Sequence, residues 1–162
     1  MGSDQRSGCL WFLFKLLKTQ PHSGTTGNES LPYCRRDFLT KAERSFFGVL
    51  QSIVQNQHLI FAKVRLADLV SIRRGTTARQ SHFNRIQSKH VDFVLCDPAT
   101  VKPMAIIELD DSSHTRKDRK TRDDFVDAVL VAAEIPIVRI PTSKSYNPDE
   151  ISSLIAQALA NN

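Results

Sequence analysis

Apolar positions recur along the chain with helical spacing in three segments. Thr40 and Glu43 form a capping box that predicts the start of a helix, and apolar residues then recur from Phe46 to Val54. A second helical stripe runs over residues 117–133. A third follows Pro148, which suits the first turn of a helix. The pattern therefore predicts three amphipathic helices.

Four further runs have the length and composition of strands. Residues 59–69 alternate between an apolar face and a wetter face. Residues 90–97 and 104–110 are apolar on both faces and are joined by a proline-bounded turn, which predicts a β-hairpin in the centre of a sheet covered on both sides. A fourth strand is expected over residues 135–140. Residues 71–89 show no clear period and are expected to form a basic connection with room for a short helical turn.

This order of elements predicts one α/β domain over residues 31–162. The chain has 162 residues, of which 41% are hydrophobic and 24% are charged, an ordinary composition for a globular domain. Residues 1–30 are expected to lie apart from it, as an apolar segment followed by a linker rich in small polar residues.

The apolar segment Cys9–Leu17 is shorter than the ~20 residues that a membrane-spanning helix needs. No convincing cleavage site follows it, and Arg6 stands where N-myristoylation requires Ser or Thr. We expect an amphipathic segment that packs on the domain or on a partner, with contact to a membrane surface as the alternative. Three widely spaced cysteines without a CxxC pair favour a reducing, cytoplasmic compartment, and Cys96 is expected to be buried.

The predicted hairpin brings three acids together. If the turn centres between residues 100 and 101, opposed residues have numbers that sum to about 201, so Asp92 lies opposite Leu109 and beside Glu108 and Asp110. Carboxylates crowded at the end of buried strands repel each other, which raises their pKa values or recruits a cation. Oxygen ligands suit Mg²⁺ or Mn²⁺. The alternative is that these acids cap strand ends and pair with an arginine such as Arg119.

Two strings of residues around these acids resemble a known family. The strings are Lys89-His-Val-Asp-Phe-Val-Leu-Cys-Asp97 and Ile106-Ile-Glu-Leu-Asp-Asp-Ser-Ser-His114, followed by Asp118 and Arg122. They resemble a bacterial family of unknown function that is placed in the PD-(D/E)XK nuclease superfamily, near the very-short-patch-repair endonucleases. The resemblance runs from about residue 33 to residue 159. It implies a restriction-endonuclease-like core of helix, three strands, helix and strand, with a C-terminal helix added here.

The resemblance also implies roles for individual residues. Asp92 matches the metal-binding Asp of the superfamily, Glu108 matches the acid of its Glu-x-Lys motif, and Glu43 matches an acid that often completes the site. Asp110 stands where the motif has the lysine that orients the attacking water. His114 is the natural substitute as a general acid or base. The weaker candidates for a migrated amine are Lys89 and Lys120.

The positive charge of the chain is concentrated beside the predicted site. The net charge is +5, and a basic balance favours polyanionic partners. Between Lys63 and Lys89 the basic residues outnumber the single acid, Asp68. The predicted nucleic-acid contacts are Lys89, Arg116, Lys117, Arg119, Lys120 and Arg122. A solvated basic face is the alternative.

These observations favour a metal-dependent DNA endonuclease or nicking enzyme. A second hypothesis is a module of the same fold that binds nucleic acid without cutting it, which the missing lysine favours. A third is an interaction domain tethered through residues 9–18 to a membrane or a partner.

Overall fold

The computed structural model describes the backbone of residues 31–110 and 117–160 and the side chains of residues 31–110 and 124–160. The predicted amphipathic segment at residues 9–18 lies outside the described residues. Within them, the elements follow one another in the order α2 (Lys41–Val54), β1 (Leu59–Arg65), α3 (Leu66–Leu69), α4 (Arg79–Ile86), β2 (His90–Cys96), β3 (Pro103–Asp110), α5 (Lys117–Ala132), β4 (Ile137–Pro141) and α6 (Pro148–Ala160).

The three predicted amphipathic helices are present as α2, α5 and α6, and the capping box of Thr40 and Glu43 is confirmed. The prediction for residues 59–69 was wrong at its end, because the strand stops at Arg65 and the short helix α3 follows. Leu66 at the start of α3 is fully buried, so the change of direction still places an apolar side chain in the core.

Helix α4 lies in the segment that was predicted to be a connection with a short helical turn. Within this helix Ile86 is the single buried residue, so the helix has almost no apolar stripe. A hydrophobic pattern therefore gave too little signal to predict its length.

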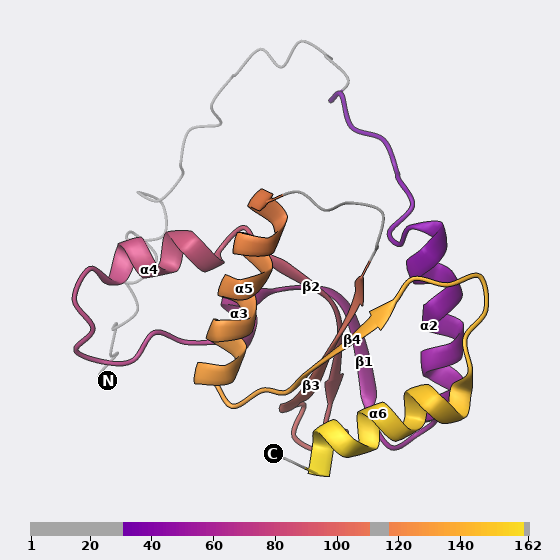
Figure 1. Cartoon of the computed structure of the whole chain (residues 1–162). Helices are drawn as coiled ribbons and strands as arrows, with labels where there is room; N and C mark the ends of the chain where they lie inside the picture. Colours follow the sequence, from indigo (N-terminus) through magenta and orange to yellow (C-terminus); the bar gives the residue numbers. More distant parts are fainter. Residues whose placement is uncertain (1–30, 111–116, 161–162) are drawn as a thin grey trace, which may run out of the picture. The chain divides into compact units, whose positions relative to one another are not determined.

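The strands form one sheet in the order β1-β2-β3-β4 (Figure 1). Strand β2 pairs antiparallel with both β1 and β3, whereas β3 and β4 run parallel. Helices α2 and α6 cover one face, and α3, α4 and α5 cover the other (Figure 1). The central position of the two doubly apolar strands is confirmed, since both faces of β2 and β3 are buried.

Two hydrophobic cores fill the space between these layers. The first core lies under α2 and α6 and contains Phe46, Leu50, Phe93 and Ile107. The second core lies under α3, α4 and α5 and contains Leu66, Val94, Ile106, Leu130 and the buried thiol of Cys96. The predicted burial of Cys96 is confirmed, and this burial raises the pKa of its thiol.

The β2–β3 hairpin forms with a register one residue away from the prediction. Phe93 pairs with Ile107, and Leu95 pairs with Ala105. The register then shifts by one residue next to the turn, between Leu95 and Cys96. Asp92 is therefore level with Glu108 rather than with Leu109, although the regular pairing of the two strands ends at Phe93 and Ile107.

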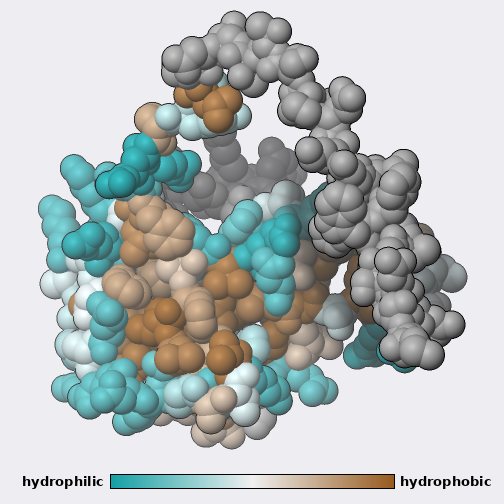
Figure 2. Space-filling view, turned by 180° about the vertical axis from the view of Figure 1, so that it is seen from behind, coloured by the Kyte–Doolittle hydropathy of each residue, from teal (hydrophilic) through white to brown (hydrophobic). Residues whose placement is uncertain are grey.

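Strand β1 forms one edge of the sheet and carries exposed apolar residues. Leu59 is 38% exposed and Phe61 is 42% exposed. Apolar surface also gathers on the face seen from behind in Figure 2. Among the helices that the structure describes, none is both long enough and apolar enough to cross a membrane.

Candidate acid–lysine site

A shared irregularity in strands β1 and β2 places two charged residues at the site. In β1, Ala62 packs on the first core and Val64 on the second; in β2, Phe93 belongs to the first core and Val91 to the second. Both strands therefore change faces at the same level, which is the level of Lys63 and Asp92. Lys63 has a φ of 55°, a left-handed conformation that costs a non-glycine residue about 1–2 kcal/mol.

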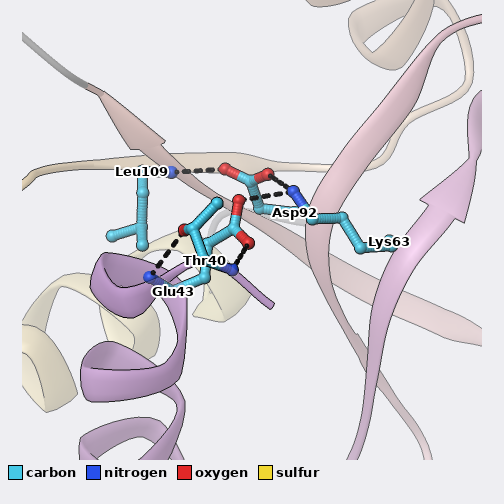
Figure 3. Close-up of polar contacts among 5 residues, drawn as sticks. All are labelled: Thr40, Glu43, Lys63, Asp92 and Leu109. Carbon is cyan, nitrogen blue, oxygen red and sulfur yellow. Dashed lines mark hydrogen bonds and ion pairs between the residues drawn. The ribbon is translucent and has the colours of Figure 1, made fainter. Parts of the chain in front are cut away.

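The side chains of Lys63, Glu43 and Asp92 meet at this irregularity. The ammonium of Lys63 donates to Oδ1 of Asp92 at 3.0 Å and also to Oε1 of Glu43 (Figure 3). The side chains of Lys63, Glu43 and Asp92 are 29%, 11% and 18% exposed. Burial lowers the pKa of Lys63, but its bonds to the two carboxylates outweigh burial and hold this pKa above its usual value.

Glu43 is oriented by the first turn of α2. Its Oε2 accepts the backbone N–H of Thr40 at 2.8 Å, and its own N–H donates to the Thr40 hydroxyl at 3.3 Å (Figure 3). One oxygen of the carboxylate therefore caps the helix while the other contacts Lys63. The glutamate of the capping box therefore also supplies an acid to the site.

Asp92 joins the acid–lysine contacts to strand β3. Its Oδ2 accepts the backbone N–H of Leu109 at 3.1 Å (Figure 3). This bond lies just beyond the last regular β2–β3 pair, where the N–H of Leu109 has a side-chain oxygen as its acceptor. The carboxylate thus lies between the two strands, with one oxygen toward β3 and the other toward Lys63.

Glu108 approaches Asp92 from strand β3. Glu108 follows Ile106 by two positions in the strand, so the two side chains point to the same face of the sheet. Ile106 belongs to the second core, and Glu108 therefore lies on the α5 side. Burial, followed by the negative charge of Asp92, raises the pKa of Glu108 from 4.5 to about 8, and the opposing charge of Arg139 limits this rise. The negative charge of Asp92 therefore acts on Glu108 from the neighbouring strand.

Asp110, the third predicted acid, has a different partner. Its carboxylate accepts a bond of 2.9 Å from Arg139 of β4, which also donates to Asp127 of α5 at 2.6 Å. The side chain of Asp110 is 50% exposed. Within the part of the chain that is described, no three His, Cys, Asp or Glu side chains are arranged as a metal-binding group.

The remaining predicted residues are placed as follows. Lys89, a candidate for a migrated amine, has its ammonium 5.6 Å from the ring centre of Phe125, and the guanidinium of Arg85 lies 4.0 Å from the same ring. His114 and Arg116 lie outside the described residues. For the predicted contacts of α5 the structure describes only the backbone; these are Lys117, Arg119, Lys120 and Arg122.

Lys63 is the residue of the site that the sequence did not reveal. Its place in an alternating strand predicted an exposed side chain beside Phe61 and Arg65. Only the pairing of β1 with β2 brings it level with Asp92, and a connection containing two helices separates these strands in the chain. No pattern of neighbouring residues in the sequence predicts the register between β1 and β2.

Fold and site together define a mixed α/β domain with a four-stranded sheet, a C-terminal helix and a cluster of acids around a lysine. The chain belongs to the family described as "Protein of unknown function (DUF2726)", whose model matches residues 35–159. No curated protein and no solved structure matches the chain.

Proposed function

We propose that this domain is a metal-dependent nuclease of the PD-(D/E)XK type, with a restriction-endonuclease-like core, that acts on DNA phosphodiesters. The observation that supports the proposal most directly is the central position of Asp92, which contacts the ammonium of Lys63 beside Glu43 and whose negative charge acts on Glu108. Acids from a first helix and from two adjacent central strands are the arrangement that the motif resemblance implies.

Asp92 and Glu108 are the residues that would hold Mg²⁺ or Mn²⁺. Their oxygen donors suit these ions, and the mutual repulsion of two half-buried carboxyl groups is relieved by a divalent cation. Such an ion supplies Lewis-acid stabilisation of charge on a phosphoryl oxygen. Asp110 is the predicted third ligand, and it would have to exchange its contact with Arg139 for this role.

Lys63 is the amine that we assign to the site in place of the lysine that the motif lacks. It contacts Asp92 directly, whereas Lys89 lies against Phe125. An ammonium at this position orients Glu43 and Asp92 and adds positive charge where a phosphate would bind. His114 remains the proposed general acid or base.

The test is cleavage of supercoiled plasmid by the full chain in Mg²⁺ or Mn²⁺. Asp92→Asn is preferable to Asp92→Ala, because the amide oxygen can still accept the N–H of Leu109. Asp68→Asn is the matched control, since Asp68 pairs on the surface with Arg65. We expect nicking by the wild type and by Asp68→Asn, and at least about a hundredfold slower nicking by Asp92→Asn and Glu108→Gln. Equal rates for all four proteins, or no cleavage by any, would refute the hydrolytic function.

A second candidate function is nucleic-acid binding without cleavage. The observation that favours it is the presence of Asp110, engaged with Arg139, at the position of the motif lysine. Binding would then persist in EDTA and in the Asp92→Asn protein. Gel-shift measurements on those two samples distinguish a binding module from an enzyme that needs its metal to engage DNA.

A further inference from the structure

A groove separate from the acid–lysine site lies between α3, the following loop and α4. Its volume is about 610 Å³, within the usual range for small-ligand sites. The floor is apolar and includes Val70, Ile72 and Ile86, while Arg79 and Gln80 add polar groups. Phe83 also lines the groove, and 37% of its surface is exposed.

The sequence around this groove is strongly basic, and its one acid, Asp68 of α3, is paired with Arg65. From Leu69 to Val91 the chain contains no Asp or Glu, while it contains five basic residues. They are Arg73, Arg74, Arg79, Arg85 and Lys89. Arg73 and Arg74 are exposed in the loop beside the groove. Nη1 of Arg79 donates to the carbonyl of Ile72 at 2.8 Å and so fastens this loop to α4.

The groove and the acid–lysine site are joined by short stretches of chain. Helix α3 begins directly after β1, which carries Lys63, and α4 is followed closely by β2, which carries Asp92. The N–H of Leu66 donates to the carbonyl of Lys89 at 2.8 Å. This bond joins the two ends of the segment that contains α3 and α4. The groove therefore belongs to the segment that connects the strand of Lys63 with the strand of Asp92.

The geometry points to this groove as a binding site for an unpaired base of single-stranded nucleic acid, with Phe83 as the stacking surface and Arg73 and Arg74 as phosphate contacts. An aromatic ring in an apolar groove with a basic rim complements a base and its phosphates. A base within a duplex has its faces covered by its neighbours, so the site selects unpaired nucleotides. This inference rests on the proposed action on nucleic acid and specifies its substrate as a strand with unpaired bases.

The experiment measures fluorescence anisotropy of a short fluorescein-labelled single strand, with a duplex of the same sequence as the second probe. The full chain is used in EDTA, so binding is measured without hydrolysis. Phe83→Ala is compared with Phe61→Ala, because these phenylalanines are 37% and 42% exposed and only the first lines the groove. Arg74→Gln is compared with Arg44→Gln, an exposed arginine of α2.

We expect Phe83→Ala to weaken single-strand binding at least about fivefold, with little change for the duplex or for Phe61→Ala. Arg74→Gln should lower the dependence of log affinity on log salt by about 0.7, and Arg44→Gln should leave it unchanged. Wild-type binding with equal affinity in both phenylalanine variants would overturn the groove assignment while leaving the nuclease proposal intact. Failure of the wild type to bind either probe would also overturn the groove assignment, whereas the nuclease proposal is decided separately by plasmid cleavage in Mg²⁺ or Mn²⁺. A dimer in sedimentation that Phe83→Ala dissociates would assign the groove to a second copy and overturn the inference.

Discussion

Replacing Lys63 with methionine would leave Glu43 and Asp92 facing one another without the ammonium that both contact. Methionine keeps most of the aliphatic stem, and it carries the same left-handed backbone cost as lysine at this position. The comparison therefore isolates the loss of the charge. Exposed ion pairs contribute about 1 kcal/mol or less, whereas removing one partner of a buried pair costs about 3–5 kcal/mol.

The three side chains are 29%, 11% and 18% exposed, which places this cluster between those limits. We expect Lys63→Met to lower the free energy of unfolding by about 2 kcal/mol. Urea denaturation followed by circular dichroism measures this loss directly. Lys102→Met is the control, because Lys102 is an exposed residue of the β2–β3 turn, and its loss should be below about 0.5 kcal/mol.

A second set of variants tests whether the loss of stability in Lys63→Met comes from the two carboxylates. Adding Glu43→Gln and Asp92→Asn to Lys63→Met should recover much of the lost stability, since the uncompensated charges are then removed. Mn²⁺ should also stabilise Lys63→Met more than it stabilises the wild type, because the divalent ion no longer competes with an ammonium. If Lys63→Met and Lys102→Met unfold at the same urea concentration, the acid–lysine cluster does not stabilise the fold as argued.

Three other perturbations follow from the same contacts. The pKa of Glu108 rises from 4.5 to about 8 on folding, so the folded state holds a proton that the unfolded state has lost between these values. Stability should therefore fall as pH rises through this window, and Glu108→Gln should flatten the dependence of Tm on pH; parallel curves would contradict this. Arg139→Met removes ion pairs to β3 and α5 and should lower the free energy of unfolding by about 1 kcal/mol in urea titrations, with no change if the half-exposed pairs are screened. Thr40→Ala should cost about 1 kcal/mol through loss of the helix cap, whereas Thr40→Ser should retain most of it.

The main elements of the fold were predictable because their signals are local. A capping box and an apolar stripe define α2 through residues that are close in the chain, and the doubly apolar strands β2 and β3 identify the centre of the sheet. The length of helix α4 was underestimated because Ile86 is the single buried residue of this helix, which leaves no periodic apolar pattern to detect. The end of β1 was misplaced because alternation continues into α3.

The acids of the site were predictable only as far as the hairpin allowed. Two strands joined by a tight turn have a register that can be inferred within one or two positions. This rule predicted that Asp92 and Glu108 are neighbours. Asp110 was expected at the same point, but pairing with Arg139 depends on the parallel neighbour β4, whose register no turn fixes. Lys63 was missed for the same reason, since its partners come from distant segments.

The left-handed backbone of Lys63 has a consequence for the open side of the sheet. Among the strands that the structure describes, none pairs with the outer edge of β1, and its exposed Leu59 and Phe61 would favour association with a strand of another molecule. Because the regular spacing of those groups is broken at Lys63, a foreign strand finds a continuous ladder only from Leu59 to Ala62. The residue that brings a positive charge to the acids thereby also shortens the stretch of this edge on which another strand could pair.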